Sequence, residues 1–252
     1  MNEVRTIKSA ETVFDILEHL RSENGARLTG VANELGMAKS TAHQYLATLE
    51  LREFVVREGD EYHIGFRFLD YGEFARSRNP VFELAKDAVV ELAELTEERA
   101  QFVIEEHGRG VYVYTATGER AVKTDSRIGK RVFLHATAAG KAILAHLPEE
   151  RIDEIFERPG LEPVTDNTIV DPAALREEFE EIRDRGVAYN DQEDTLRLRA
   201  VGVPVKDAEG AVLGALSVSG PTHRFKGEVL EREIPDLLLG TANELELNIE
   251  YM

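Results

Sequence analysis

Residues 28–49, LTGVANELGMAKSTAHQYLATL, contain two short segments of helical periodicity separated by Gly36. The first segment has one apolar side, and Thr29 is its predicted N-cap. The second segment repeats apolar residues with the spacing of a buried stripe, at Ala42, Tyr45, Leu46 and Leu49. Two helices joined by such a glycine turn predict a helix-turn-helix, whose second helix reads DNA.

The opposite side of the second segment is polar and nearly free of charge. Between positions 35 and 49 the sequence has one basic residue, Lys39, and no acidic one. A surface that faces phosphates needs such an acid-free patch. An ordinary pair of packed helices with a solvated polar face is the alternative interpretation of this stretch when it is taken alone.

The flanking sequence favours the DNA-binding interpretation. Residues 7–20 repeat apolar side chains with helical spacing, which predicts a third helix that closes a small core. Residues 54–66 contain two strand-like runs around Glu58-Gly59-Asp60, where the glycine permits a positive φ in a hairpin turn. Three helices followed by a two-stranded wing predict a winged helix-turn-helix.

Seven residues are the candidates for DNA contacts: Lys39, Ser40, Thr41, His43, Gln44, Thr48 and Arg57. We expect the first half of the second helix to enter the major groove, where Gln44 can make a bidentate contact with adenine. Lys39 and Thr48 are predicted to anchor phosphates, and Arg57 on the wing to reach the backbone or the minor groove. For His43 two interpretations stay open, a base contact or a place on the polar face without one.

Five separated motifs resemble, in their order and spacing, the IclR family of transcriptional regulators. They are IKSAETVFDILEHL (7–20), LTGVANELGMAKSTAHQYLATL (28–49), FVVREGDEYHIGFRFLDYG (54–72), RVFLHATAAGKAILAHLP (131–148) and ALSVSGP (215–221). The resemblance covers nearly the whole chain. It implies a winged helix, a linker helix and a C-terminal ligand-sensing domain of GAF/PAS-like α/β architecture. It also implies a double-stranded DNA operator, a small-molecule effector and a homodimer or homotetramer. The family often has arginine at the position of Gln44, which leaves the operator sequence open.

The expected fold class is α+β. We assign residues 1–65 to a winged helix-turn-helix, 66–79 to a linker helix and 80–252 to an effector-binding domain with an antiparallel sheet. From residue 81 onward, helical and strand periods alternate, and hairpins join several strands. The predicted elements are helices over 81–95, 137–147 and 172–185 and strands over 101–107 and 110–117.

Composition excludes several classes of protein. No apolar run approaches the roughly 20 residues that span a bilayer, and the N-terminus lacks the apolar region of a signal peptide. The expectation is a soluble, cytoplasmic protein with no membrane partner. The chain has no cysteine, which excludes disulfides and thiolate chemistry, and its seven histidines are scattered without ligand spacing. No metal and no cofactor is predicted.

The net charge is unusual for a DNA-binding protein. With 48 acidic and 30 basic residues the chain has a formal charge of −18, and residues 1–75 hold eight basic and thirteen acidic residues, a net charge of −5. The composition, with eight Lys against 22 Arg, is similar to that of proteins from salt-loving organisms. At molar salt the Debye length is about 3 Å, so repulsion from the wider surface is screened. Specificity then depends on base-edge hydrogen bonds and bivalent binding. An acidic protein that binds another protein is the competing interpretation.

The predicted linker helix, residues 65–78, carries aromatic side chains around its circumference, and Asn79-Pro80 ends it. Exposed aromatic residues imply a partner surface, most simply the same helix of a second subunit. A two-fold dimer would place two recognition helices about 34 Å apart, one turn of DNA. Packing against the chain's own C-terminal domain is the alternative.

The last predicted hairpin, RAVGVPVK and AVLGALSVSG, has one face of unusually small residues. Pairing Lys206 with Ala211 predicts Gly202 opposite Ala215, Ala200 opposite Ser217 and Leu198 opposite Ser219, all on one face. The other face is bulky: Val201, Val203, Val205, Val212, Leu216 and Val218. A small face can receive a closely packed helix, or it can leave space for a small molecule.

A helix N-terminus favours the second possibility. Thr137 is the predicted N-cap of a helix whose first backbone N–H groups can attract a carboxylate, which suggests a small organic acid. The resemblance points to the same region, although Asn190 stands where the family commonly has an acid and Ala200 where a cysteine can stand. The candidate effector-binding residues are His135, Ala138, Ala139, Gly140, Asn190, Asp191, Leu198, Ala200, Ser217 and Ser219.

Catalysis is the rival class of function. Ser217 or Ser219 could be combined with His135 and Asp191 into a triad, but both serines lie within a predicted strand and no nucleophile-elbow sequence surrounds them. No enzymatic activity is predicted. The sequence predicts a DNA-binding regulator that responds to a small molecule, and the alternative is a winged-helix regulator with a vestigial pocket that a protein partner controls.

Overall fold

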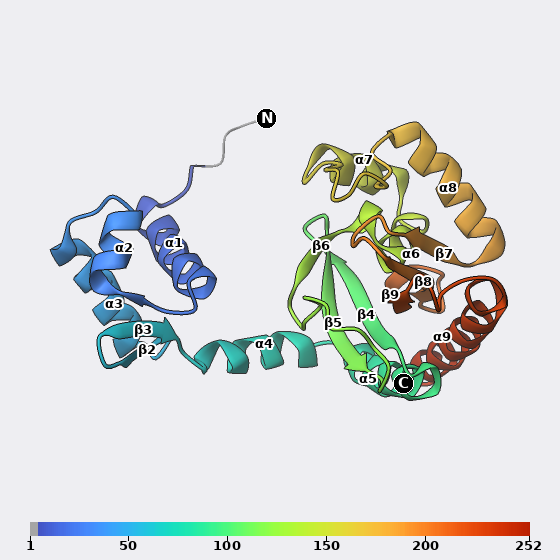
Figure 1. The fold of residues 1–252 in the computed structure, drawn as a ribbon, viewed down its shortest axis with the longest axis horizontal. Helices are drawn as coiled ribbons and strands as arrows, with labels where there is room; N and C mark the ends of the chain where they lie inside the picture. The colour runs from blue at the N-terminus through green and yellow to red at the C-terminus, as the bar shows by residue number, and fades with distance from the viewer. Residues whose placement is uncertain (1–4) are drawn as a thin grey trace. The chain divides into compact units, whose positions relative to one another are not determined.

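The computed structural model describes residues 5–252. The chain divides into two compact units, Met1–Arg78 and Asn79–Met252. Figure 1 shows both, and each is described by itself. The α+β class predicted from the sequence is confirmed.

The N-terminal unit begins with three helices around a small core. They are α1 (Lys8–Ser22), α2 (Leu28–Glu34) and α3 (Lys39–Leu51). Ile16 and Leu20 of α1 are buried together with Val31 of α2 and with Ala42 and Leu46 of α3. This packing is the helix-turn-helix that the periodicity predicts.

The turn between α2 and α3 depends on Gly36, whose φ of +58° lies in the left-handed region that favours glycine. The predicted N-cap of α2 is wrong. Arg27 precedes the helix without a side-chain cap, and Thr29 lies in its first turn. Helix α2 begins earlier because strand β1 (Ala26–Arg27) leads directly into it.

The wing is a hairpin of β2 (Val55–Glu58) and β3 (Glu61–Ile64), with Gly59 at a φ of +63° in the turn. Strand β1 pairs with β3 on the other side and makes the sheet three-stranded, which the sequence did not predict. After the wing comes α4 (Arg67–Ser77), the predicted linker helix.

The C-terminal unit is built on one antiparallel sheet with the strand order β6-β5-β4-β9-β8-β7. The strands are β4 (Arg99–Glu106), β5 (Arg109–Thr117), β6 (Arg131–Phe133), β7 (Ala188–Asp191), β8 (Leu198–Lys206) and β9 (Val212–Pro221). Because β4 pairs with β9, the first hairpin of the domain lies beside the last one.

Helices cover both faces of this sheet (Figure 1). On one face, α5 (Pro80–Thr96) and α9 (Ile234–Glu250), which follows η2 (Val229–Glu233), pack with the bulky residues of β8 and β9. On the other face lie η1 (Leu134–Ala136), α6 (Ala138–Leu144), α7 (Glu149–Glu157) and α8 (Pro172–Arg185). The predicted ends of α8 are confirmed, since the Asp171 side chain accepts from the Ala174 N–H and Gly186 follows with a φ of +73°.

The register of the β8–β9 hairpin differs from the prediction by two residues. The observed pairs are Leu198 with Pro221, Ala200 with Ser219 and Gly202 with Ser217. The turn explains the difference, because the Asp207 N–H donates to the Ala211 carbonyl at 2.9 Å and a bulge follows, so that Lys206 pairs with Val212. A shift by two keeps each side chain on its predicted face. Val212 is the exception, because it lies beyond the bulge and packs on the side of α6.

The small face of this hairpin both receives a helix and borders a cavity. At Gly202, α6 lies directly on the strand: a Cβ atom there would come within 2.7 Å of the Ala138 carbonyl carbon and the Ala139 nitrogen. Ser217, the strand partner of Gly202, and the next pair on this face, Ala200 and Ser219, instead border a cavity. The first glycine therefore seats the helix, and the serines remain available to a ligand.

Candidate DNA interface and effector cavity

Helix α3 presents its polar residues on one exposed face. Lys39, Ser40, His43, Gln44 and Thr48 are exposed and Thr41 is half-buried, whereas Ala42, Leu46 and Leu49 face the core. The residues proposed for base and phosphate contacts are thus brought together, apart from Arg57, which lies on β2 of the wing.

Two of these side chains already have partners. The Thr48 hydroxyl donates to the Gln44 carbonyl at 2.7 Å, so its proton is engaged within the helix. The Arg57 Nε donates to the Gly59 carbonyl at 3.0 Å, and its guanidinium lies 5.6 Å from the centre of the Tyr62 ring. Arg57 is therefore held along the wing, where its Nη2 also lies 3.9 Å from Asp60 Oδ1.

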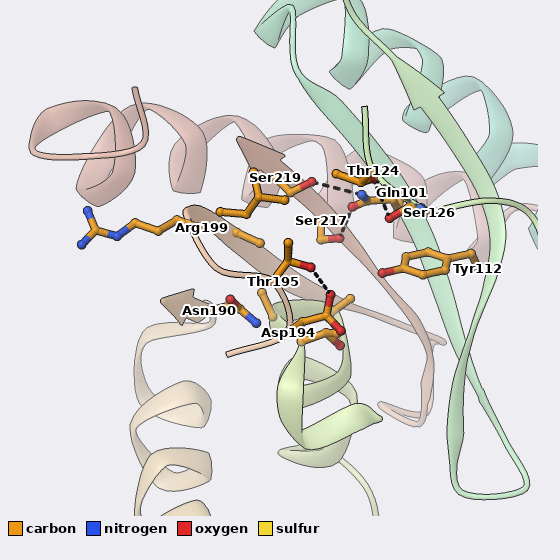
Figure 2. A pocket seen from close by; sticks show the side chains of 15 residues that line it. Gln101, Tyr112, Thr124, Ser126, Asn190, Asp194, Thr195, Arg199, Ser217 and Ser219 are labelled. Carbon is orange, nitrogen blue, oxygen red and sulfur yellow. Dashed lines mark hydrogen bonds between the residues drawn. The ribbon is translucent and has the colours of Figure 1, made fainter. Parts of the chain in front are cut away.

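The C-terminal domain has a cavity of about 50 Å³ between the small face of the sheet and the start of α6 (Figure 2). Most of the residues that line it have polar side chains. The lining residues are Gln101, Tyr112, Thr124, Ser126, Thr137, Ala138, Ala139, Asn190, Asp194, Thr195, Leu198, Arg199, Ala200, Ser217 and Ser219. Seven of the candidate effector-binding residues are among them: Ala138, Ala139, Asn190, Leu198, Ala200, Ser217 and Ser219.

Three candidates do not line the cavity, and their contacts explain why. His135 is buried in η1 and its Nε2–H donates to the Glu162 carbonyl at 3.0 Å; burial lowers the pKa of this imidazole. Gly140 lies behind the wall, where a Cβ atom would come within 2.1 Å of the Leu134 carbonyl oxygen. Asp191 accepts hydrogen bonds of 2.8 and 3.0 Å from Arg199 and is turned to solvent.

The N-terminus of α6 offers fewer free donors than the sequence suggested. Thr137 is the N-cap, as predicted, but its side chain accepts from the Gly140 N–H at 3.1 Å. The N–H of Gly140, the third residue of the helix, is therefore already occupied. Ala138 and Ala139, the first two residues of the helix, are the ones that border the cavity.

The opposite wall of the cavity was not predicted from the sequence. Gln101, Tyr112, Thr124 and Ser126 come from β4, β5 and the segment that follows β5, and Asp194 and Thr195 come from the loop between β7 and β8. A polar residue inside the apolar run QFVI, at Gln101, was a usable signal. It could not be assigned to the cavity without the pairing of β4 with β9.

Gln101 joins both serines. The Ser217 hydroxyl donates to Gln101 Oε1 at 2.8 Å, and Gln101 Nε2 donates to the Ser219 hydroxyl at 3.2 Å. Figure 2 shows this chain of bonds along one wall of the cavity. Because Gln101 and Ser217 are buried, the amide fixes the direction of each hydrogen bond.

Tyr112 extends into the cavity from β5 (Figure 2). Burial raises the pKa of its phenol to about 12, and the nearby negative charge of Asp194 acts in the same direction, whereas Ser126 and Arg99 oppose the shift. At neutral pH the phenol is protonated and can both donate and accept a hydrogen bond.

Lys141, in the motif RVFLHATAAGKAILAHLP, anchors the loop between β7 and β8 beside the cavity. Lys141 is 1% exposed, and its Nζ donates to Glu178 Oε1 at 2.7 Å and to Glu193 Oε1 at 2.8 Å. Burial raises the pKa of Glu193 in spite of this contact. Glu193 directly precedes Asp194, so the buried ion pairs hold the loop that supplies Asp194 and Thr195.

Asn190 stabilises the same loop from β7. Its Nδ2 donates to the Ala136 carbonyl, and its Oδ1 accepts from the Glu193 N–H at 3.2 Å. The amide suits this position because it bonds an acceptor and a donor at once, which a carboxylate does not.

The side chains of a serine triad are not assembled. Ser217 donates to Gln101, His135 to the Glu162 carbonyl, and Asp191 pairs with Arg199. Within residues 5–252, no group of three or more histidine or acidic residues could hold a metal ion. No helix in the same range is long and apolar enough to cross a membrane.

A winged helix-turn-helix followed by an α+β domain with a polar cavity defines a class of DNA-binding proteins with a separate domain for a second ligand. Family models agree with this organisation. "IclR helix-turn-helix domain" matches residues 9–59, and "Bacterial transcriptional regulator IclR C-terminal" matches residues 74–247. The chain belongs to the IclR family of transcriptional regulators, and it is a regulator and not an enzyme.

Individual relatives extend over almost the full length. The chain is 32% identical over 252 residues to a probable HTH-type transcriptional regulator ArcR of Halobacterium salinarum, covering 98% of this chain and 96% of the relative. The crystal structure of the Thermotoga maritima IclR protein matches with a TM-score of 0.82 and 31% identity, over 98% of this chain and 100% of that one. An IclR homologue from Microbacterium hydrocarbonoxydans, solved in complex with 4-hydroxybenzoate, shares the fold, with a TM-score of 0.76 and 22% identity over 94% and 97% of the two chains.

Proposed function

We propose that this regulator binds an operator through α3 and the wing, and that a small organic acid or related catabolic metabolite in the cavity changes its affinity for that operator. The observation that carries the proposal is the cavity itself. Its wall combines hydroxyl and amide groups with the small residues of β8 and β9, and a neighbour of the same fold was solved with a small organic acid.

The size of the cavity limits the ligand. An apolar cavity of about 150 Å³ accommodates benzene, whereas this one measures about 50 Å³. A ligand the size of a benzoate therefore requires the wall to move, and a smaller acid does not. The segment of residues 118–130, which supplies Thr124 and Ser126, has no helix or strand and is the part of the wall best able to move.

The effector acts through differential affinity. A ligand that binds one arrangement of the protein more tightly than another shifts the population toward that arrangement. A coupling free energy of about 1–3 kcal/mol changes operator affinity by roughly 5- to 150-fold. The expected response is of this size.

We also propose that the chain acts as a homodimer or homotetramer. Helix α4 exposes Phe66 just before its start, Leu69 and Phe74, which are 91%, 69% and 69% exposed. Two copies would bring two α3 helices to half-sites about one DNA turn apart. Light scattering of the full chain in concentrated potassium chloride measures the oligomeric state. The proposal requires a dimer or tetramer, and Phe74→Ser tests whether the exposed aromatic residues of α4 hold it together.

The DNA part of the proposal is tested by two substitutions on α3. We expect Gln44→Ala to reduce discrimination between operator and random duplex by about 1–3 kcal/mol, because a base contact is lost. We expect Lys39→Ala to weaken binding to both duplexes equally and to reduce the salt slope by about one unit, because a phosphate contact is lost.

The measurement begins with mapping of the bound genomic fragments by the full chain, followed by fluorescence anisotropy on the strongest fragment and on a shuffled duplex. Titration in several potassium chloride concentrations gives the slope. Equal discrimination by the wild-type chain and Gln44→Ala would reject the role of Gln44. A wild-type chain that does not discriminate the two duplexes would reject the proposed function.

A further inference from the structure

The charges around the cavity are not balanced within its wall. Arg199 lines the cavity, but Asp191 neutralises it through hydrogen bonds of 2.8 and 3.0 Å, and Figure 2 shows its side chain pointing away from the serines. Two other charged groups, Arg99 and Asp194, have no such partner. Asp194 lines the cavity, whereas Arg99 lies beside it and is not one of the lining residues.

Arg99 is a buried cation beside the cavity. It lies on β4 opposite Ser219, on the same face of the strand as Gln101, and only 7% of it is exposed. Its guanidinium donates to the carbonyl oxygens of Ser126 and Val122, at 3.1 and 3.2 Å, while Nε is buried without a hydrogen-bond partner. Over the described residues 5–252, Arg99 makes no ion pair.

A buried cation without a counter-charge is unfavourable, because burial removes the water that stabilises the charge. The pKa of Arg99 is lowered accordingly, with burial as the main cause. Both of its carbonyl partners belong to the 118–130 segment, which forms the neighbouring wall. An anion bound beside Ser219 and Ser126 would supply the missing counter-charge.

Asp194 is the unpaired anion of the opposite wall. Its carboxylate accepts from the Thr195 hydroxyl at 2.9 Å, and in the part of the chain that the structure describes it forms no ion pair. Tyr112 lies near enough to both Asp194 and Arg99 for each charge to affect the pKa of its phenol. The cavity is therefore negative on the side of Asp194 and positive on the side of Arg99.

The hydrogen bonds of the two serines agree with this distribution of charge. The Ser217 hydroxyl donates its hydrogen bond to Gln101, so it can only accept a hydrogen bond from a ligand. Ser219 accepts from Gln101 and keeps its proton, so it can donate to a ligand. Because Ser219 is the strand partner of Arg99, the donor hydroxyl and the buried cation lie at the same end.

We propose that the cavity recognises a small carboxylic acid that also carries a hydrogen-bond donor, either a hydroxyl or an ammonium group. The carboxylate lies toward Ser219 and Arg99, and the donor group lies on Asp194. Asp194 repels an acid bound in the reverse orientation. This inference rests on the proposed function, because it names the ligand class of the same cavity, and Arg99 and Asp194 are its specificity-determining residues.

The test uses four three-carbon compounds that differ in one group each: propionate, lactate, alanine and propane-1,2-diol. Binding to the full chain is measured by isothermal titration and by thermal shift in concentrated potassium chloride. We expect lactate or alanine to bind at least tenfold more tightly than both propionate and the diol. Equal binding of propionate would overturn the role of Asp194, and equal binding of the diol would overturn the role of Arg99. No binding of either lactate or alanine would overturn the proposal as a whole.

Two substitutions test which residue recognises which group of the ligand. Arg99→Met is expected to reduce the affinity for the acid at least tenfold. Asp194→Asn is expected to reduce the affinity for alanine at least tenfold but to change that for lactate by less than threefold, because the amide oxygen still accepts from a hydroxyl. Arg127→Met is the matched control, since Arg127 lies on the same 118–130 segment but is exposed and paired with Asp125.

Operator binding without ligand separates this inference from the proposed function. If Arg99→Met keeps operator affinity and loses acid binding, the inference is supported independently of folding. If Arg99→Met and Asp194→Asn both retain the wild-type preference for the acid, the inference is wrong although the regulator interpretation stands. If the acid binds as expected but leaves operator affinity unchanged, the ligand class is supported and the proposed regulation is wrong.

Discussion

Replacing Lys141 with methionine is expected to lower the free energy of unfolding of the C-terminal domain by about 3–5 kcal/mol, because it leaves buried carboxylates without their cation. Glu193 is 5% exposed, and one oxygen each of Glu178 and Glu193 already lacks a hydrogen-bond partner. Urea unfolding of the full chain in potassium chloride, followed by circular dichroism, measures the loss. Lys130→Met is the control, because Lys130 pairs with the exposed Asp125 and should change stability by less than about 1 kcal/mol.

The pH dependence of this variant identifies the cause. Burial raises the pKa of Glu193 in the folded state, and loss of the Lys141 cation raises it further. A carboxyl group whose folded pKa exceeds its unfolded pKa binds a proton more readily when folded, so acidification stabilises the fold. The difference between Lys141→Met and wild type should therefore shrink as the pH falls, and Glu193→Gln in the variant should restore part of the stability. A difference that is independent of pH would contradict this explanation.

Replacing Gly140 with alanine is expected to destabilise the same domain by about 3 kcal/mol, because a side chain does not fit between α6 and η1. Its Cβ atom would lie 2.1 Å from the Leu134 carbonyl oxygen and 2.5 Å from the Leu134 Cα, and backbone atoms on both sides cannot rotate away. Thermal and urea unfolding measure the change.

Gly240→Ala is the matched control for this substitution. Gly240 lies within α9, is exposed, and has no atom within 4 Å of the position of a Cβ. Alanine there should stabilise the helix by about 0.5–1 kcal/mol, because alanine loses less backbone entropy than glycine. If both substitutions changed the stability in the same direction, steric conflict at Gly140 would not be the cause.

The N-terminal domain was predictable because its determinants are local. The stripe of Ala42 and Leu46, the left-handed Gly36 and the hairpin at Gly59 each specify structure within a few residues. The short strand β1 was missed, because two residues give no periodicity. The placement of Thr29 as a cap was wrong, since the chain enters α2 directly from that strand.

Half of the cavity could be predicted for the same reason. Ala200, Ser217 and Ser219 share a face of one hairpin, and alternation alone assigns them to it even when the register is shifted by two. The register of this hairpin depends on a bulge between Val205 and Lys206, and no residue type in the sequence predicts that bulge. Gln101 lies 116 positions from Ser217, and only the pairing of β4 with β9 brings the two together.

His135 and Asp191 show the opposite error. Both have residue types that suit a binding site, and both lie next to segments that form one. Their side chains are directed elsewhere by single contacts, with the Glu162 carbonyl and with Arg199. Sequence position fixes the element, whereas the direction of a side chain depends on neighbours that come from distant parts of the chain.

The sparse charge on the exposed face of α3 has a consequence for the behaviour of this regulator in a cell. Lys39 is the one basic side chain that α3 contributes to that face, so the helix displaces few counterions from DNA. Occupancy of the operator should then vary little when the osmotic state of the cell changes its potassium content. We expect such a regulator to respond to its ligand and to stay nearly indifferent to osmotic stress.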